Sequence, residues 1–194
     1  MSNTEPLPVE FDESLAAEFD YIAQTAAQAT EDRARVSSFY LIAVGSLLAA
    51  MFGTQFLGMP SLPIPINLML SGLFFLLTLL GTSTIMQLGR LRAAWYESML
   101  AMNQLKDYMI NENKPLAKAF RWQSSTLPPK YKTNSVSYYQ AMEVALISGL
   151  MLGAAFFFLF HAFFRIGLLH WMLFILMGGL AMYVQLNTYK RILK

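Results

Sequence analysis

The sequence has no cysteine, only two histidines and little charge. Without cysteine there are no disulfides, thiolate metal ligands or sulfur nucleophiles. Charged residues make up 13% of the 194 residues and hydrophobic residues 56%, whereas roughly a quarter of the residues of a soluble globular protein are charged. The most informative absence is local, because residues 36–89 contain no Asp, Glu, Lys or Arg. These absences indicate that a lipid bilayer surrounds much of the chain.

Long, nearly uncharged segments predict the membrane-spanning helices. A helix needs about 20 apolar residues to cross a hydrocarbon core of roughly 30 Å. Four segments meet this requirement, namely 36–58, 66–88, 135–164 and 168–189. We therefore predict an all-α integral membrane protein whose four transmembrane helices form two antiparallel hairpins. External connections are predicted at 59–65, which contains Pro60, Pro63 and Pro65, and at 165–167, which ends in Gly167.

The distribution of Lys and Arg predicts the orientation in the membrane, because these residues favour the cytoplasmic side. With the N-terminus inside, thirteen bases lie on the cytoplasmic side and Arg165 alone lies outside. We predict cytoplasmic N- and C-termini in the inner or plasma membrane, with a disordered acidic segment at 1–11 and a basic C-terminus at 190–194. The acidic start lacks the positive charge of a secretory signal, so we expect no cleaved targeting peptide.

Two segments outside the bilayer have helical periodicity. Residues 12–35, with Asp12 as a plausible N-cap, and residues 89–113 both carry apolar residues at spacings of three, four or seven. No Gly or Pro interrupts residues 90–114, so one helix of roughly 70 Å is expected over 66–113. We predict that the two stripes pair as a cytoplasmic stalk, within one subunit or between subunits. The predicted stalk interface is Leu15, Phe19, Ile22, Leu91, Trp95, Met102, Leu105 and Met109.

A basic linker that also contains aromatic residues is predicted at 114–134. Pro115 at the first helical position allows a short helix to about Trp122, and Asn134 or Ser135 is expected to cap the next long helix. The bases of this linker are Lys114, Lys118, Arg121, Lys130 and Lys132. We interpret them as contacts to anionic lipid headgroups, with no nucleic-acid partner, because interleaved bases and aromatic residues alone are weak evidence for nucleic-acid binding.

Two patterns lie inside the predicted spans. Small residues that let helices approach closely recur at four-residue spacing, including Gly45, Ala49, Gly53, Gly149 and Gly153. Such rows serve packing inside one subunit or an interface between subunits. Polar residues of the second span, on one helical face, are Asn67, Ser71, Thr78 and Thr82. They either line a conduit or bond carbonyl groups of their own or a neighbouring helix.

Catalytic and cofactor-binding groups are scarce in the predicted spans. None carries an ionisable residue at mid-depth, where such a residue would indicate function, and Glu143 lies only at the entrance of the third. His161 and His170 flank the outer connection without an acid or cysteine to complete a metal site, so we interpret them as solvated interfacial residues. We predict no metal, no cofactor and no enzyme activity.

The favoured hypothesis is a self-associating, homo-oligomeric membrane protein whose stalk serves assembly or docks a cytoplasmic protein partner. The main alternative is a homo-oligomeric ion channel or membrane-permeabilising effector, with the polar row of the second span lining the conduit. A third class is an embedded enzyme or ion-coupled carrier, which would depend on Glu143 or His161.

Overall fold

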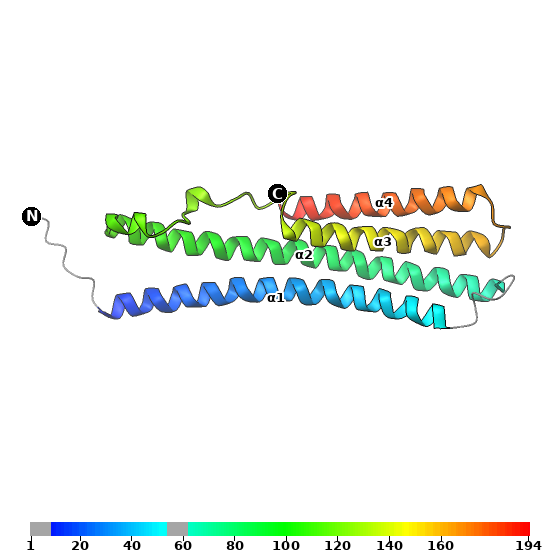
Figure 1. Cartoon of the computed structure of the whole chain (residues 1–194), viewed down its shortest axis with the longest axis horizontal. Helices are drawn as coiled ribbons and strands as arrows, with labels where there is room; N and C mark the ends of the chain where they lie inside the picture. The colour runs from blue at the N-terminus through cyan, green and yellow to red at the C-terminus, as the bar shows by residue number, and fades with distance from the viewer. Residues whose placement is uncertain (1–8, 54–61) are drawn as a thin grey trace, which may run out of the picture. The chain divides into compact units, whose positions relative to one another are not determined.

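The computed structural model describes residues 9–53 and 62–194, and in these ranges every regular element is a helix (Figure 1). The elements are α1 (Val9–Gly53), α2 (Ile64–Glu112), η2 (Lys114–Lys118), η3 (Ser124–Thr126), α3 (Val136–His161) and α4 (Leu168–Ile192). The four α-helices are long and apolar enough to cross a membrane. The predictions of an all-α chain and of four helices of spanning length are confirmed.

Helix α2 continues without a break from the second apolar segment into the charged segment that follows it. Its start is fixed by the amides of Ile66 and Asn67, which donate to the Pro63 carbonyl at 3.0 and 3.2 Å. The Asn67 side-chain amide donates to the Leu62 carbonyl at 3.0 Å. Pro65 lies in the first turn, where its missing amide proton leaves no intrahelical bond unmade. The helix therefore begins two residues earlier than predicted and includes the end of the expected connection.

Helix α1 likewise joins an acidic, patterned segment to an apolar one. It begins at Val9, so the prediction of Asp12 as N-cap is wrong: Asp12 lies inside the helix, one turn further along. The helix is described as far as Gly53. Residues 1–8 and 54–61 lie outside the described residues. The second of these ranges contains the end of the predicted first span and Pro60 of the predicted connection.

Capping residues explain where α3 and α4 begin. The hydroxyl of Ser135 accepts a hydrogen bond from the Tyr138 amide at 3.3 Å, so Ser135, and not Asn134, caps α3. Helix α3 ends at His161 and α4 starts after Gly167, which makes the connection three residues longer than predicted. Helix α4 continues to Ile192, beyond the predicted span.

The linker after α2 contains less helix than predicted. Pro115 does lie at the start of a helix, but that helix is the 3₁₀ element η2, which ends at Lys118. The expectation of a helix to Trp122 is therefore wrong. Residues 119–123 form no regular element, and η3 covers one further turn.

The chain divides into two compact units. The first comprises residues 1–32 and 91–130, and is therefore built from the N-terminal part of α1, the C-terminal part of α2 and the linker. The second comprises residues 33–90 and 131–194, and contains the apolar parts of α1 and α2 with all of α3 and α4. Both periodic segments that were predicted to pair as a stalk belong to the first unit of the same chain.

Candidate functional site, a polar cluster inside the apolar unit

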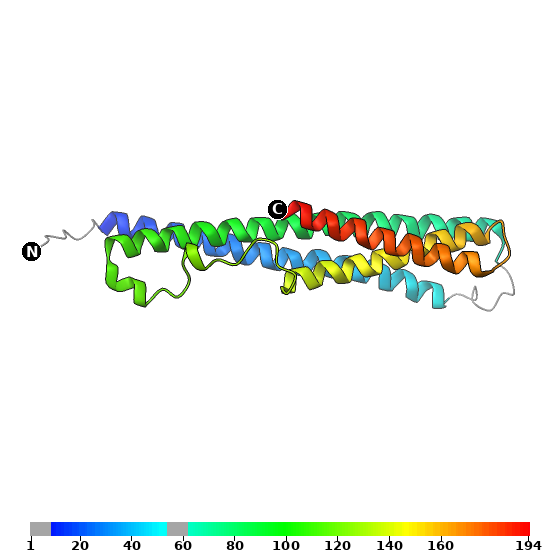
Figure 2. The same ribbon diagram turned by 90° about the horizontal axis from the view of Figure 1, so that it is seen from above.

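Helices α3 and α4 pack closely in the second unit and lie side by side in both views (Figures 1 and 2). A Cβ atom placed on Gly149 would lie 2.6 Å from the Gly178 carbonyl oxygen, and one on Gly153 would lie 2.7 Å from the Phe174 carbonyl oxygen. The Ser137 and Tyr189 hydroxyls are 2.8 Å apart. As the residue number of the contact increases along α3, the number of its partner in α4 decreases. The two helices are therefore antiparallel. The backbones approach so closely because glycine has no side chain.

Helix α2 meets α1 and α3 at a glycine that the sequence reasoning missed. A Cβ atom on Gly81 would lie 2.5 Å from the Ser148 hydroxyl oxygen and 2.8 Å from the Tyr40 hydroxyl oxygen. Ser148 is fully buried and Tyr40 is 1% exposed. Polar groups from α1 and α3 therefore converge on one point of α2.

Gln185 of α4 completes a hydrogen-bonded cluster around this point. Its side-chain nitrogen donates to the Ser148 hydroxyl at 2.7 Å and to the Thr82 hydroxyl at 2.8 Å. The Ser148 and Thr82 hydroxyls in turn donate to the Thr78 carbonyl at 3.3 and 2.9 Å. The cluster ties α2, α3 and α4 together in a single register, because the three bonds that join different helices would break if one helix shifted along another.

One oxygen atom at this cluster, the Gln185 side-chain carbonyl oxygen, has no hydrogen-bond partner among the described residues. The Gln185 side chain is buried. The cluster holds hydroxyl and amide groups but no carboxylate, imidazole or ammonium group. Such groups exchange hydrogen bonds and fix helix positions, and membrane hydrogen bonds of this kind contribute about 0.6 kcal/mol each on average.

The polar row of the second span faces the interior of the second unit. Asn67, Ser71 and Thr78 are buried and Thr82 is half-buried. The Thr78 hydroxyl donates to the Phe74 carbonyl of its own helix at 3.0 Å, while Thr82 belongs to the cluster around Gln185. This placement favours the packing interpretation of the row over the conduit interpretation, because the side chains face other helices of the same chain.

The small-residue row of α1 has different surroundings from the row of α3. Among the described residues, no atom would lie within 4 Å of a Cβ placed on Gly45 or Gly53. Ala49, one turn from each, is exposed. The neighbouring Ser46 and Ala50 are also exposed, so small residues form a continuous face of α1 that no described part of the chain covers.

The two histidines approach each other at the connection between α3 and α4, with ring centroids 6.2 Å apart. His170 is 2% exposed, and its Nδ1 accepts a hydrogen bond from the Gly167 amide at 3.3 Å. The expectation of a solvated His170 is therefore wrong, since the side chain folds back to cap α4 and packs against Phe157 and Phe160. Among the described residues there is no group of three or more potential metal ligands.

In the first unit, the predicted stalk residues line a groove. Leu15 and Phe19 of α1 and Leu105 and Met109 of α2 form its walls together with Phe120 of the linker. The remaining predicted residues are buried or half-buried, namely Ile22, Leu91, Trp95 and Met102. The linker was not expected to contribute to this surface, because it has no helical periodicity.

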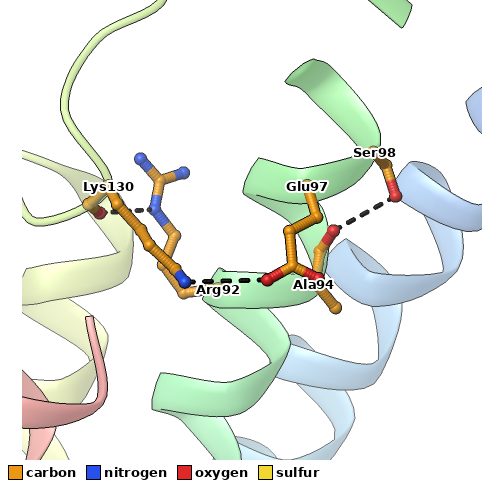
Figure 3. A network of polar contacts seen from close by, with 5 residues as sticks. All are labelled: Arg92, Ala94, Glu97, Ser98 and Lys130. Carbon is orange, nitrogen blue, oxygen red and sulfur yellow. Dashed lines mark hydrogen bonds and ion pairs between the residues drawn. The ribbon is translucent and has the colours of Figure 1, made fainter. Parts of the chain in front are cut away.

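Polar contacts hold the linker against the C-terminal part of α2. The Arg92 Nε donates to the Lys130 carbonyl at 3.4 Å, and the Lys130 ammonium lies 3.7 Å from a Glu97 carboxylate oxygen (Figure 3). Further along, the Asn103 side chain donates to the Gln123 carbonyl at 3.3 Å, and Asp107 accepts from the Ser124 amide at the same distance. The linker is thus anchored at both ends of its course along α2.

The linker bases that were predicted to contact anionic lipid have unequal surroundings. Lys114, Lys118, Arg121 and Lys132 are exposed, and the Arg121 guanidinium lies 6.0 Å from the centre of the adjacent Trp122 ring. Lys130 is half-buried and paired with Glu97. The ammonium of Lys130 therefore pairs with a carboxylate of the first unit.

Of the polar cluster, Thr78 and Thr82 were among the residues predicted from the sequence, whereas Ser148 and Gln185 were not. A signal was present, because both are polar residues within long apolar runs and each lies on a different predicted span. What the sequence does not state is that the two side chains meet. Only the packing of α2, α3 and α4 brings them within hydrogen-bonding distance.

Comparison of the chain with protein-family models, curated proteins and solved structures gives no match. The class of protein therefore follows from the fold alone. This is an all-helical chain with four helices of spanning length and composition, compatible with a multi-pass membrane protein in contact with lipid.

Proposed function

We propose that the chain is a non-enzymatic multi-pass protein of the inner or plasma membrane that self-associates through α1. The first unit, in this proposal, is a cytoplasmic stalk that serves assembly or docks a protein partner. The observation that carries the proposal is the exposed face of small residues on α1.

The exposed faces of the other spanning helices support this interpretation by contrast. On α2 and α4 most exposed side chains are bulky, for example Leu76 and Ile175 at 57% and 70% exposure, although Gly72 and Gly179 are also exposed. Bulky apolar side chains suit contact with flexible acyl chains. On α1 the exposed face from Gly45 to Gly53 is flat, and such a face gains more van der Waals contact from a second helix than from lipid. A second copy of α1 offers the same flat face.

The charge distribution supports the orientation. The second unit carries Arg165 alone at the connection between α3 and α4. Its other bases lie where its segments adjoin the first unit in sequence or at its C-terminal end, namely Arg33, Arg35, Arg90, Lys132, Lys190, Arg191 and Lys194. Because short segments rich in Lys and Arg tend to remain on the cytoplasmic side, the proposal places the first unit and both termini in the cytoplasm. Labelling of single cysteines introduced at Ser2 and Arg165 with a membrane-impermeant reagent tests this, since only the second site should react in intact cells.

The composition of the first unit supports a docking role. It carries eleven acids and six bases, and its groove between Leu15, Phe19 and Leu105 leaves apolar surface open. A partner with an apolar residue flanked by bases would suit this surface. We expect Met102→Lys, on the predicted stripe, to abolish capture of a cytoplasmic partner, whereas Gln104→Lys, on the exposed face of the same turn, should leave it intact. Equal loss in both variants would argue against the stripe.

The test of self-association is the mass of the purified particle in nanodiscs. We expect the wild type to contain more than one copy. Gly45→Leu should shift the particle toward the monomer, because the added side chain holds the backbones apart. Gly179→Leu is the matched control, since Gly179 of α4 is also open but is surrounded by bulky exposed residues. A monomeric wild type, or equal effects of the two substitutions, would overturn the proposal.

Vesicle permeability separates this proposal from the channel alternative. The polar row of α2 is hydrogen-bonded inside one chain, which supports tight vesicles. We expect reconstituted vesicles to retain trapped ions. A leak that is abolished by Thr78→Leu together with Thr82→Leu, with particle mass unchanged, would instead favour a homo-oligomeric channel lined by this row.

A further inference from the structure

A groove with a volume of about 400 Å³ runs between α1 and α2 in the second unit. Its walls include Arg35, Phe39 and Ala43 of α1 and Leu80, Ser83 and Gln87 of α2. The buried Tyr40 ring also lines it. All of these residues belong to the same compact unit.

The chemistry of the groove changes along its length. Arg35 directly precedes the uncharged segment 36–89 in α1, and Gln87 lies two residues before the end of that segment in α2. Ser83 lies one turn from Gln87, whose side-chain nitrogen donates to the Ser83 hydroxyl at 3.4 Å. Further into the uncharged segment, the walls are Phe39, Ala43 and Leu80. One end is thus polar and basic, and the other is apolar.

The apolar end requires a cover. Phe39 is 68% exposed and Leu80 is 47% exposed, although both lie within a segment without any charge. Side chains of this kind at bilayer depth are covered by acyl chains or by another protein. The polar end favours a phospholipid over another protein. Its guanidinium, hydroxyl and side-chain amide can all donate hydrogen bonds to the oxygen atoms of a phosphate group.

The residues near the polar end include more bases than acids, and the acids nearest to Arg35 in the sequence are Glu31 and Asp32. The second unit contains eight bases and a single acid, Glu143. The end of α4 reaches this level of α2: a Cβ atom on Gly89 would lie 3.2 Å from Ile192, and the Lys190 ammonium lies 5.7 Å from the centre of the Tyr131 ring. The bases of the second unit within two residues of Arg35, Gly89, Tyr131 or Ile192 in the sequence are Arg33, Arg90, Lys132, Lys190, Arg191 and Lys194. The resulting positive field favours an anionic occupant.

We propose that this groove binds one anionic phospholipid of the surrounding leaflet. The headgroup phosphate lies against Arg35, Ser83 and Gln87, and one acyl chain lies along Phe39, Ala43 and Leu80. Amphipathic character and charge complementarity identify the occupant, since an apolar helix would leave the polar end unmatched. The site is independent of self-association and lies outside the linker bases that were predicted from the sequence to contact lipid.

Native mass spectrometry of the purified full-length chain tests the site. The probe is an equimolar mixture of phosphatidylglycerol and phosphatidylcholine with identical acyl chains. We expect the wild type to retain one phosphatidylglycerol molecule in preference. Arg35→Gln should lower this retention about fivefold, which corresponds to roughly 1 kcal/mol for one base near an anionic headgroup. Arg191→Gln is the matched control, because it removes the same charge near the same helix ends outside the groove.

A second pair of variants tests the apolar end without a change of charge. Ala43→Phe should fill the groove and abolish retention, while Ala34→Phe, on the opposite, exposed face of α1, should preserve it. Circular dichroism of each variant serves as the folding control and should show the helix content of the wild type. Equal retention of both lipids, equal losses with Arg35→Gln and Arg191→Gln, or retention that survives Ala43→Phe would overturn the site. If Ala43→Phe changes only the particle mass, the groove is a contact between copies, and the lipid site is likewise overturned.

Discussion

The small-residue rows of α1 and α3 have the same four-residue spacing but opposite surroundings. On α3, Gly149 and Gly153 lie against the backbone of α4, so closely that a methyl group in either place would overlap a carbonyl oxygen. On α1, Gly45 and Gly53 have open space before them among the described residues. The comparison teaches that small-residue spacing gives a helix the capacity for close contact, while the neighbouring helix decides whether one chain uses that capacity.

The largest expected effect is on the filled row. Gly149→Leu should lower the free energy of unfolding by about 3 kcal/mol, because the side chain has to displace the Gly178 carbonyl of α4. Gly45→Leu should change the stability of a single chain by no more than about 0.5 kcal/mol, since its face is open. Unfolding by SDS in mixed micelles, at protein dilutions that keep the chain monomeric, measures both. Similar losses of stability in the two variants would contradict the difference in packing between the rows of α3 and α1.

An intermediate effect is expected for the polar cluster that lies beside the filled row. Ser148→Ala removes the bond from Gln185 and the bond to the Thr78 carbonyl, and should lower stability by about 1 kcal/mol. Ser46→Ala, the same substitution on the exposed face of α1, serves as control and should have no measurable effect. The same unfolding assay applies. If Ser148→Ala left the free energy of unfolding unchanged, the cluster would fill space without fixing the helix register.

The smallest effect is expected for the Glu97–Lys130 pair of the first unit, which water can reach. Glu97→Gln removes the pair with Lys130, in which the Glu97 side chain is 71% exposed. The free energy of unfolding, measured by thermal unfolding, should fall by about 0.5 kcal/mol or less. The loss should be smaller still in 1 M salt, because water and ions screen such a pair. A large, salt-resistant loss would show that the linker contact is as important as the contacts inside the apolar unit.

Sequence patterns predicted most of the helical structure because they are properties of single segments. The absence of charge between residues 36 and 89, and of Gly and Pro between 90 and 114, is enough to predict the continuous helix α2. Its first turn was missed because a proline there is compatible with helix. A cap at Asn134 or Ser135 was predicted from the side-chain types alone, whereas the choice of Ser135 required the backbone geometry.

The sequence by itself determined that this chain has four helices of spanning length, that two of them continue into charged segments, and that the first 32 residues hold eight acids and no base. These features follow from local hydrophobicity, charge and helix propensity, which act within one segment. The tertiary structure alone decided that Gly149 faces α4 while Gly45 stays open, and that Ser148 meets Gln185. Contacts between helices depend on rotation and register, and many combinations of these satisfy the same local pattern, so only the packed chain selects one.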